Sequence, residues 1–145
     1  MREFNPEPSM ITLDDYYRGY NTDPRYIDEL TAAIRIDAAT TVKRANALLS
    51  RYYSENLSAD HAHVTSGWRP KAVNAAIPTA AKNSKHMIGR AIDLSDPEGD
   101  LDEWCMGNQN AMAECDLWLE HPSSTKGWSH WQIVPPASGK RVFYP

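Results

Sequence analysis

The segment NSKHMIGRAIDLSD (residues 83–96) joins a polar loop to a short run rich in apolar residues. Gly89 lies at the junction, where a glycine allows the chain to turn tightly. The second half, RAIDLSD, is typical of a short strand, because it is bounded by Gly89 and by the turn-forming DPEGD. Asp93 stands between Ile92 and Leu94, so we expect its carboxylate to be at least partly buried.

A buried carboxylate is costly unless it is paired, hydrogen-bonded or bound to a metal ion. His86 lies in the loop half of the same segment, and a histidine and an aspartate in these positions can offset that cost by sharing a cation. Zinc in hydrolytic sites takes three protein ligands and leaves one position for water. The best third ligand is His130, because it also lies between bulky residues of a predicted strand, WSHWQIV.

Other metal arrangements stay open on these residues alone. Three further histidines compete with His130 for the third position: His61, His63 and His121. A structural metal site would instead require a fourth protein ligand, for which His121 or Cys115 is available. A site of two histidines and one carboxylate is also compatible with several divalent metals.

The remaining pattern predicts an α+β fold, with helices packed on a small, mostly antiparallel sheet. The clearest helix is DAATTVKRANALLSRYYSEN, for which Asp37 is the expected N-cap. Its apolar face consists of Ala38, Val42, Ala45, Leu49 and Tyr52. A shorter helix should begin at Thr12 in TLDD, and residues 101–115 should be helical in part. Strands are expected in HAHVTSGW, GRAIDLSD, DLWLE, WSHWQIV and RVFYP.

The composition is that of one globular domain, residues 1–145, with 41% hydrophobic and 23% charged residues. Its 15 basic and 19 acidic residues give a net charge of −4 without any run of Lys and Arg, so nucleic acid is not an expected partner. The first ten residues, MREFNPEPSM, lack the apolar region of a secretory signal, and no stretch is apolar enough to span a membrane. We expect a monomer that is made in the cytoplasm without a signal peptide. Cys105 and Cys115 are expected to be reduced thiols.

The segment SKHMIGRAID matches, residue for residue, the pattern S-x-H-x-x-G-x-A-x-D of the zinc peptidases that cut peptidoglycan stem peptides. Upstream, TSGWRP resembles the family segment S-G-[YW]-R, and downstream WSH resembles the second metal motif, which ends in a histidine ligand. The three segments occur in the family's order. This superfamily includes D-Ala-D-Ala dipeptidases and carboxypeptidases and the L-Ala-D-Glu endopeptidases of phage endolysins, and the Hedgehog signalling domain shares its fold.

The resemblance implies a Hedgehog-like fold and one Zn²⁺ held by three ligands: His86, Asp93 and His130. It implies that Arg69 binds a substrate carboxylate or stabilises the oxyanion formed on attack. Ser84 and Ser66 would contact the substrate, or Ser84 would orient the loop that carries His86. The simpler interpretations are a structural salt bridge for Arg69 and a loop cap for Ser84.

One position departs from the family pattern. Relatives usually carry an acidic general base three residues before the last histidine ligand, and Gly127 occupies that position here. The nearest upstream acid is Glu120, at the end of DLWLE, a predicted strand that can run beside the one bearing His130. We therefore assign Glu120 as the candidate base. The alternative for Glu120 is an exposed loop acid next to Pro122.

The function that the resemblance implies is zinc-dependent hydrolysis of peptidoglycan stem peptides, by a phage or prophage endolysin that reaches the cell wall after release. A D-Ala-D-Ala carboxypeptidase is the first alternative. The second is a non-catalytic cell-wall-binding or virion protein that keeps the zinc site, and Gly127 is the residue that favours it.

Overall fold

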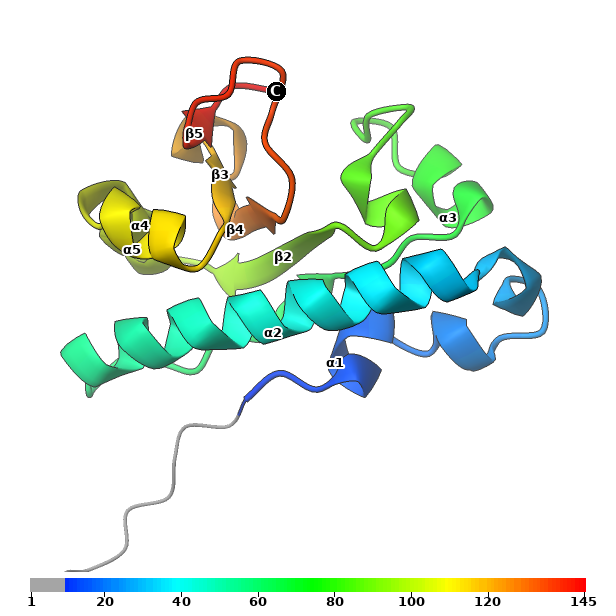
Figure 1. Cartoon of the computed structure of the whole chain (residues 1–145), viewed down its shortest axis with the longest axis horizontal. Coiled ribbons are helices and arrows are strands. Elements are labelled where there is room, and N and C mark those ends of the chain that lie inside the picture. Colours follow the sequence, from blue (N-terminus) through cyan, green and yellow to red (C-terminus); the bar gives the residue numbers. More distant parts are fainter. Residues whose placement is uncertain (1–9) are drawn as a thin grey trace, which may run out of the picture.

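The computed structural model describes residues 10–145, and these form an α+β fold in which five α-helices accompany one five-stranded sheet (Figure 1). The expectation about a secretory signal concerns residues that, apart from Met10, lie outside this described part. Across residues 10–145 no helix has the length and apolar character needed to cross a membrane.

The helices and strands alternate along the chain in an irregular order. The helices are α1 (Leu13–Tyr17), α2 (Ala32–Glu55), α3 (Lys71–Ala75), α4 (Asp100–Gly107) and α5 (Gln109–Glu114). The strands are β1 (Val64–Ser66), β2 (Ala91–Asp96), β3 (Trp118–Glu120), β4 (Gly127–Gln132) and β5 (Val142–Phe143). All five expected strands are confirmed, whereas α3 was not predicted.

The sheet is mostly antiparallel, with the strand order β1-β2-β4-β3-β5. Only the β3–β5 pair is parallel among the described strands. The long central pair, β2 and β4, places Asp93 directly opposite His130 and Ala91 opposite Gln132. This register brings two of the three predicted metal ligands together from segments far apart in the sequence.

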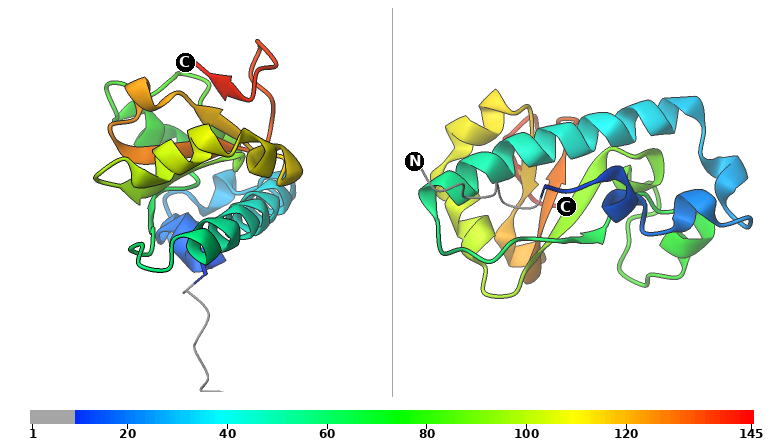
Figure 2. Two further views of the ribbon diagram at one scale, coloured as in Figure 1. Left: turned by 90° about the vertical axis from the view of Figure 1, so that its left-hand side faces the viewer. Right: turned by 90° about the horizontal axis from the view of Figure 1, so that it is seen from below.

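Helix α2 runs along one side of the sheet for most of the length of the molecule (Figures 1 and 2). It begins at Ala32, where the Thr31 side chain accepts a hydrogen bond from the Ile34 amide. The expected cap, Asp37, is therefore wrong: this residue lies within the helix and its carboxylate pairs with Arg90 at 2.8 Å. The predicted apolar face is confirmed, because all five of its residues are buried: Ala38, Val42, Ala45, Leu49 and Tyr52.

The other local expectations are largely confirmed. Thr12 caps α1 in a capping box with Asp15. Residues 101–115 divide into α4 and α5, which meet at Asn108. Cys105 and Cys115 are free, as expected of reduced thiols.

One apolar core joins α2, the sheet and the α4–α5 pair. Its largest fully buried side chains include Trp68, Trp131, Leu48, Ile92 and Leu94. This core lies under the β2–β4 pair and supports the two strands that carry Asp93 and His130.

Candidate metal centre

The structure brings the three predicted metal ligands together. His86 lies in the 3-10 turn η3 (Lys85–Ile88), Asp93 in β2 and His130 in β4. One ligand atom from each lies within 4.8 Å of the others. Asp93 Oδ1 is 2.8 Å from His130 Nδ1 and 3.2 Å from His86 Nε2. These side chains are almost completely removed from solvent.

No other residue among positions 10–145 joins this group. The competing histidines, His61, His63 and His121, are not part of it, and neither is Cys115. The alternative of a structural site with four protein ligands therefore finds no fourth ligand in this part of the chain.

The turn that carries His86 is shaped by the residues around it. Ser84 is its N-cap, and its hydroxyl accepts a hydrogen bond from the His86 amide at 3.2 Å. Gly89 ends the turn with a φ of +75°, and a Cβ there would lie 2.9 Å from the Ile34 carbonyl oxygen. Thr41 of α2 donates a hydrogen bond to the Gly89 carbonyl at 2.7 Å. The expectation that Ser84 orients the His86 loop is consistent with this geometry.

The hydrogen-bond partners of the His86 imidazole show which of its nitrogens is free to bind a cation. Its Nδ1 lies 2.8 Å from the Gly67 carbonyl oxygen, which only accepts, so Nδ1 carries the hydrogen. Nε2 then presents a lone pair, has no hydrogen-bond partner and is buried. It faces the Asp93 carboxylate at 3.2 Å, so two acceptors oppose each other. Ligand atoms at about 2.0 Å from a tetrahedral zinc ion lie about 3.3 Å apart, close to the 3.2 Å between these two atoms, so this pair suits a zinc ion.

The electrostatics favour ligand forms of His86 and Asp93. Burial lowers the pKa of His86 and keeps its imidazole neutral. Burial alone would raise the pKa of Asp93, but His86 and the hydrogen bond from His130 hold it well below its usual range. Burial opposes protonation of His130, yet its hydrogen bond to Asp93 leaves its pKa raised in the metal-free protein.

Arg69 is held against the site by three contacts. Its Nε donates to Ser66 Oγ at 2.8 Å, Nη1 to Asn74 Oδ1 at 3.1 Å, and Nη2 to Asp93 Oδ2 at 3.4 Å. The guanidinium therefore forms an ion pair with a candidate metal ligand, and Ser66 orients it. Asn74, which the sequence did not single out, is buried and also donates to the Ala81 carbonyl.

Glu120 lies in the same cleft as the triad. It is the last residue of β3 and is partly buried, so it is a strand residue and not an exposed loop acid. Burial raises its pKa, His130 lowers it to a smaller extent, and Asp93 adds to the rise. Gly127, by contrast, is exposed at the start of β4, three residues before His130, and pairs with Asp96 at the end of β2.

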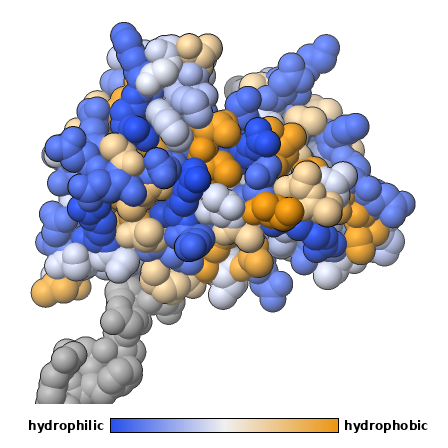
Figure 3. Space-filling model, in the orientation of Figure 1, coloured by the Kyte–Doolittle hydropathy of each residue, from blue (hydrophilic) through white to orange (hydrophobic). Residues whose placement is uncertain are grey.

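The triad lies at the floor of a cleft of about 500 Å³. The segment from Ile77 to His86 forms one wall, and β3, β5 and Trp128 form the other. In Figure 1 the ribbon of residues 77–86 lies on one side of the β2–β4 pair and the ribbons of β3 and β5 lie on the other, and the outline of the space-filling view dips between these two parts (Figure 3).

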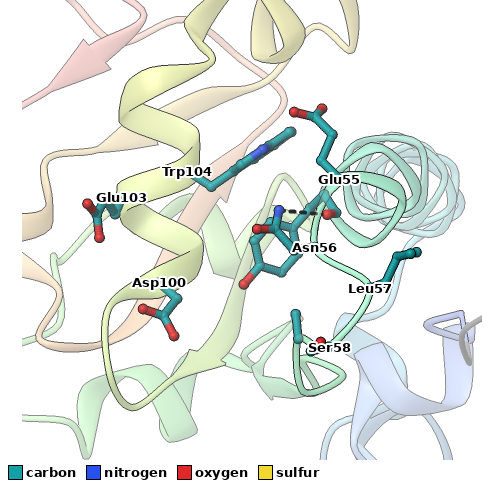
Figure 4. A pocket seen from close by; sticks show the side chains of 9 residues that line it. Glu55, Asn56, Leu57, Ser58, Asp100, Glu103 and Trp104 are labelled. Carbon is teal, nitrogen blue, oxygen red and sulfur yellow. Dashed lines mark hydrogen bonds between the residues drawn. The ribbon is translucent and has the colours of Figure 1, made fainter.

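A second hollow, of about 640 Å³, lies where the end of α2 approaches α4 (Figure 4). It holds three carboxylates, those of Glu55, Asp100 and Glu103, beside Trp104. They form no group of three metal ligands within residues 10–145, so the triad remains the candidate metal centre.

A search against protein-family models and a search of curated proteins found no match to this chain. The resemblance described above therefore depends on the motif residues and on the geometry of the site that they form.

Proposed function

We propose that this protein is a zinc-dependent peptidase that hydrolyses peptidoglycan stem peptides, with the fold of the D-Ala-D-Ala peptidase and Hedgehog group. The observation that carries the proposal is the buried triad at the floor of an open cleft, with the unpartnered His86 Nε2 directed at the Asp93 carboxylate. The motif residues that resemble the peptidase family are the same residues that form this arrangement.

His86, Asp93 and His130 would hold one Zn²⁺. A bound zinc ion lowers the pKa of a water molecule to about 7 and polarises a carbonyl group. Glu120 would accept the proton of the attacking water and transfer it to the leaving amine as the peptide C–N bond breaks. Burial raises the pKa of Glu120, which makes its carboxylate a stronger base than that of an exposed glutamate.

Arg69 would serve two purposes in this mechanism. Its charge near Asp93 Oδ2 helps to keep that carboxylate ionised. A guanidinium has five N–H donors, so those not used by Ser66, Asn74 and Asp93 can bind an oxyanion or a substrate carboxylate.

The bond we propose is that between L-Ala and D-Glu, cut by a phage or prophage endolysin that acts on the cell wall after release. Hydrolysis of the terminal D-Ala-D-Ala bond is the alternative within the same family. The position of Glu120 in the cleft supports catalysis over a binding role, because it supplies an acid where Gly127 does not.

Digestion of purified Gram-negative peptidoglycan, with and without a chelator, tests the proposal when the released fragments are read by mass spectrometry. Chelator-sensitive release of peptides cut between L-Ala and D-Glu is the expected result. Loss of a terminal D-Ala alone would identify the carboxypeptidase. A protein that binds zinc and releases no fragment would be a binding domain, and the proposal of catalysis would be wrong.

A further inference from the structure

Gln132 is a buried amide beside the triad for which the proposed mechanism has no use. It lies two residues after His130 on the same face of β4, between Ala91 of β2 and Trp118 of β3. Only 4% of its surface is exposed. A buried amide is costly unless its donors and acceptor are satisfied, so its two polar atoms need partners.

The partners of Gln132 determine how its amide is oriented. Nε2 donates to the Val134 carbonyl oxygen at 2.9 Å, and that oxygen can only accept. Oε1 is thereby turned toward His130 Nε2, at 3.2 Å. An amide oxygen also only accepts, so His130 must carry a hydrogen on Nε2.

We propose that Gln132 is a positioning residue that keeps the hydrogen of His130 on Nε2 and so reserves Nδ1 for the metal ion. Nδ1 is the nitrogen that faces Asp93 Oδ1, at 2.8 Å. The inference rests on the proposed zinc site but not on peptidase activity. Hydrogen bonds to the outer nitrogen of a ligating histidine fix its tautomer and ring orientation.

The two histidines are thus oriented through opposite nitrogens. His86 donates through Nδ1 to a backbone carbonyl, that of Gly67, and offers Nε2 to the metal position. His130 donates through Nε2 to a side chain, and without a metal ion its Nδ1 donates to Asp93 Oδ1, so a metal ion would take the place of the hydrogen on Nδ1. Because the partner of His130 is a side chain, substitution can remove it without altering the backbone.

The test compares zinc affinities of the full-length protein, measured by competition with a chromogenic chelator. Gln132→Met keeps the length of the side chain but lacks the acceptor, and we expect it to bind zinc about 10- to 100-fold more weakly. Gln132→Glu keeps the acceptor for His130 Nε2 but replaces the donor to the Val134 carbonyl with a second acceptor, so it should bind zinc more weakly than the wild type and more tightly than Gln132→Met. Ser129→Ala is the matched control, because it removes the buried hydrogen bond to Trp131 on the other face of β4 and should leave zinc affinity unchanged.

A nitrogen-15 NMR spectrum of the zinc-loaded wild type provides an independent readout. We expect His130 to be bound through Nδ1 and to show a hydrogen-bonded Nε2–H, with faster exchange of that proton in Gln132→Met. Binding through Nε2, or equal zinc affinity in Gln132→Met and the wild type, would overturn the inference. Weakening in Gln132→Glu as large as that in Gln132→Met would also overturn it, because it would indicate a merely structural role.

These results separate the inference from the proposed function. A protein that binds zinc, loses affinity in Gln132→Met and cuts no peptidoglycan would retain the inference and lose the peptidase. If the protein cuts peptidoglycan and the wild type and Gln132→Met bind zinc equally tightly, the peptidase would be retained and the inference would be lost. A wild type that binds no zinc would overturn the inference as well.

Discussion

At the scale of single residues, Glu120 carries the sharpest prediction. Glu120→Gln should lower the rate of stem-peptide hydrolysis about 100- to 10,000-fold, because the amide cannot accept a proton from water. Zinc affinity should stay unchanged, since Glu120 is not one of the three ligands. Assays of zinc-loaded protein on purified peptidoglycan provide the measurement.

The matched control is Glu98→Gln, which neutralises an exposed acid outside the cleft and should keep full activity. Full turnover in Glu120→Gln with zinc bound would remove Glu120 as the base.

Asp102 gives a second prediction at this scale, one that concerns stability. It is 3% exposed in α4, accepts a hydrogen bond from Thr125 at 3.0 Å, and leaves Oδ1 without a partner. Burial raises its pKa to about 6, so the folded protein holds this proton more tightly than the unfolded chain. The resulting stability is present below about pH 4 and is lost as the pH rises through about 6.

Asp102→Asn should remove this dependence, because an amide still accepts from Thr125 but does not ionise. Relative to this variant, the wild type should lose about 2 kcal/mol of unfolding free energy between pH 4 and 7. Urea titrations of both proteins across that range measure the difference. Parallel pH profiles would show that Asp102 titrates normally in the folded state.

At the scale of elements, the sequence predicted the strands better than the ends of the helices. Alternation and flanking turn residues were enough to locate all five strands. The start of α2 was predicted too late, because AAIRI shows little amphipathic pattern while Thr31 is as acceptable a cap as Asp37. Helix α3 follows Pro70 and has only five residues, so it offers no periodicity to detect.

The corrected start of α2 can be tested directly. Thr31→Ala should destabilise the protein by about 1 kcal/mol, because it removes the N-cap hydrogen bond to the Ile34 amide. Asp37→Ala should cost less than about 1 kcal/mol, since it removes only a partly exposed ion pair with Arg90. Chemical denaturation of the two variants compares them, and a larger loss in Asp37→Ala would argue against the cap at Thr31.

At the scale of the whole molecule, the site depends on how distant segments meet. The motif selected the candidate ligands, but only the β2–β4 register places Asp93 opposite His130. Sequence spacing gave no sign that Asn74 would reach Arg69 and only a weak sign that Gln132 would reach His130. Alternation along β4 does put Gln132 on the same face as His130, so that contact had a weak signal.

Zinc binding should therefore stabilise the whole domain, since the three ligands come from three elements. An ion that binds only the folded state adds about 2.7 kcal/mol when its concentration is 100 times the dissociation constant. The melting temperature should rise with added zinc and fall with chelator. His130→Ala should abolish this response and His121→Ala should retain it, whereas loss of the response in His121→Ala would place His121 among the ligands.

The backbone at Gly127 has a consequence for how this sequence can have diverged from the family that it resembles. Its φ of +93° lies in the left-handed region, where a residue with a side chain is strained by about 1–2 kcal/mol. A Gly127→Glu substitution would therefore place an acid at the family's position, but on a strained backbone. An acid at position 127, where the family that the chain resembles has its base, would therefore require a different local chain path as well. Under the proposed function, a glutamate at position 127 would not by itself replace Glu120 as the base.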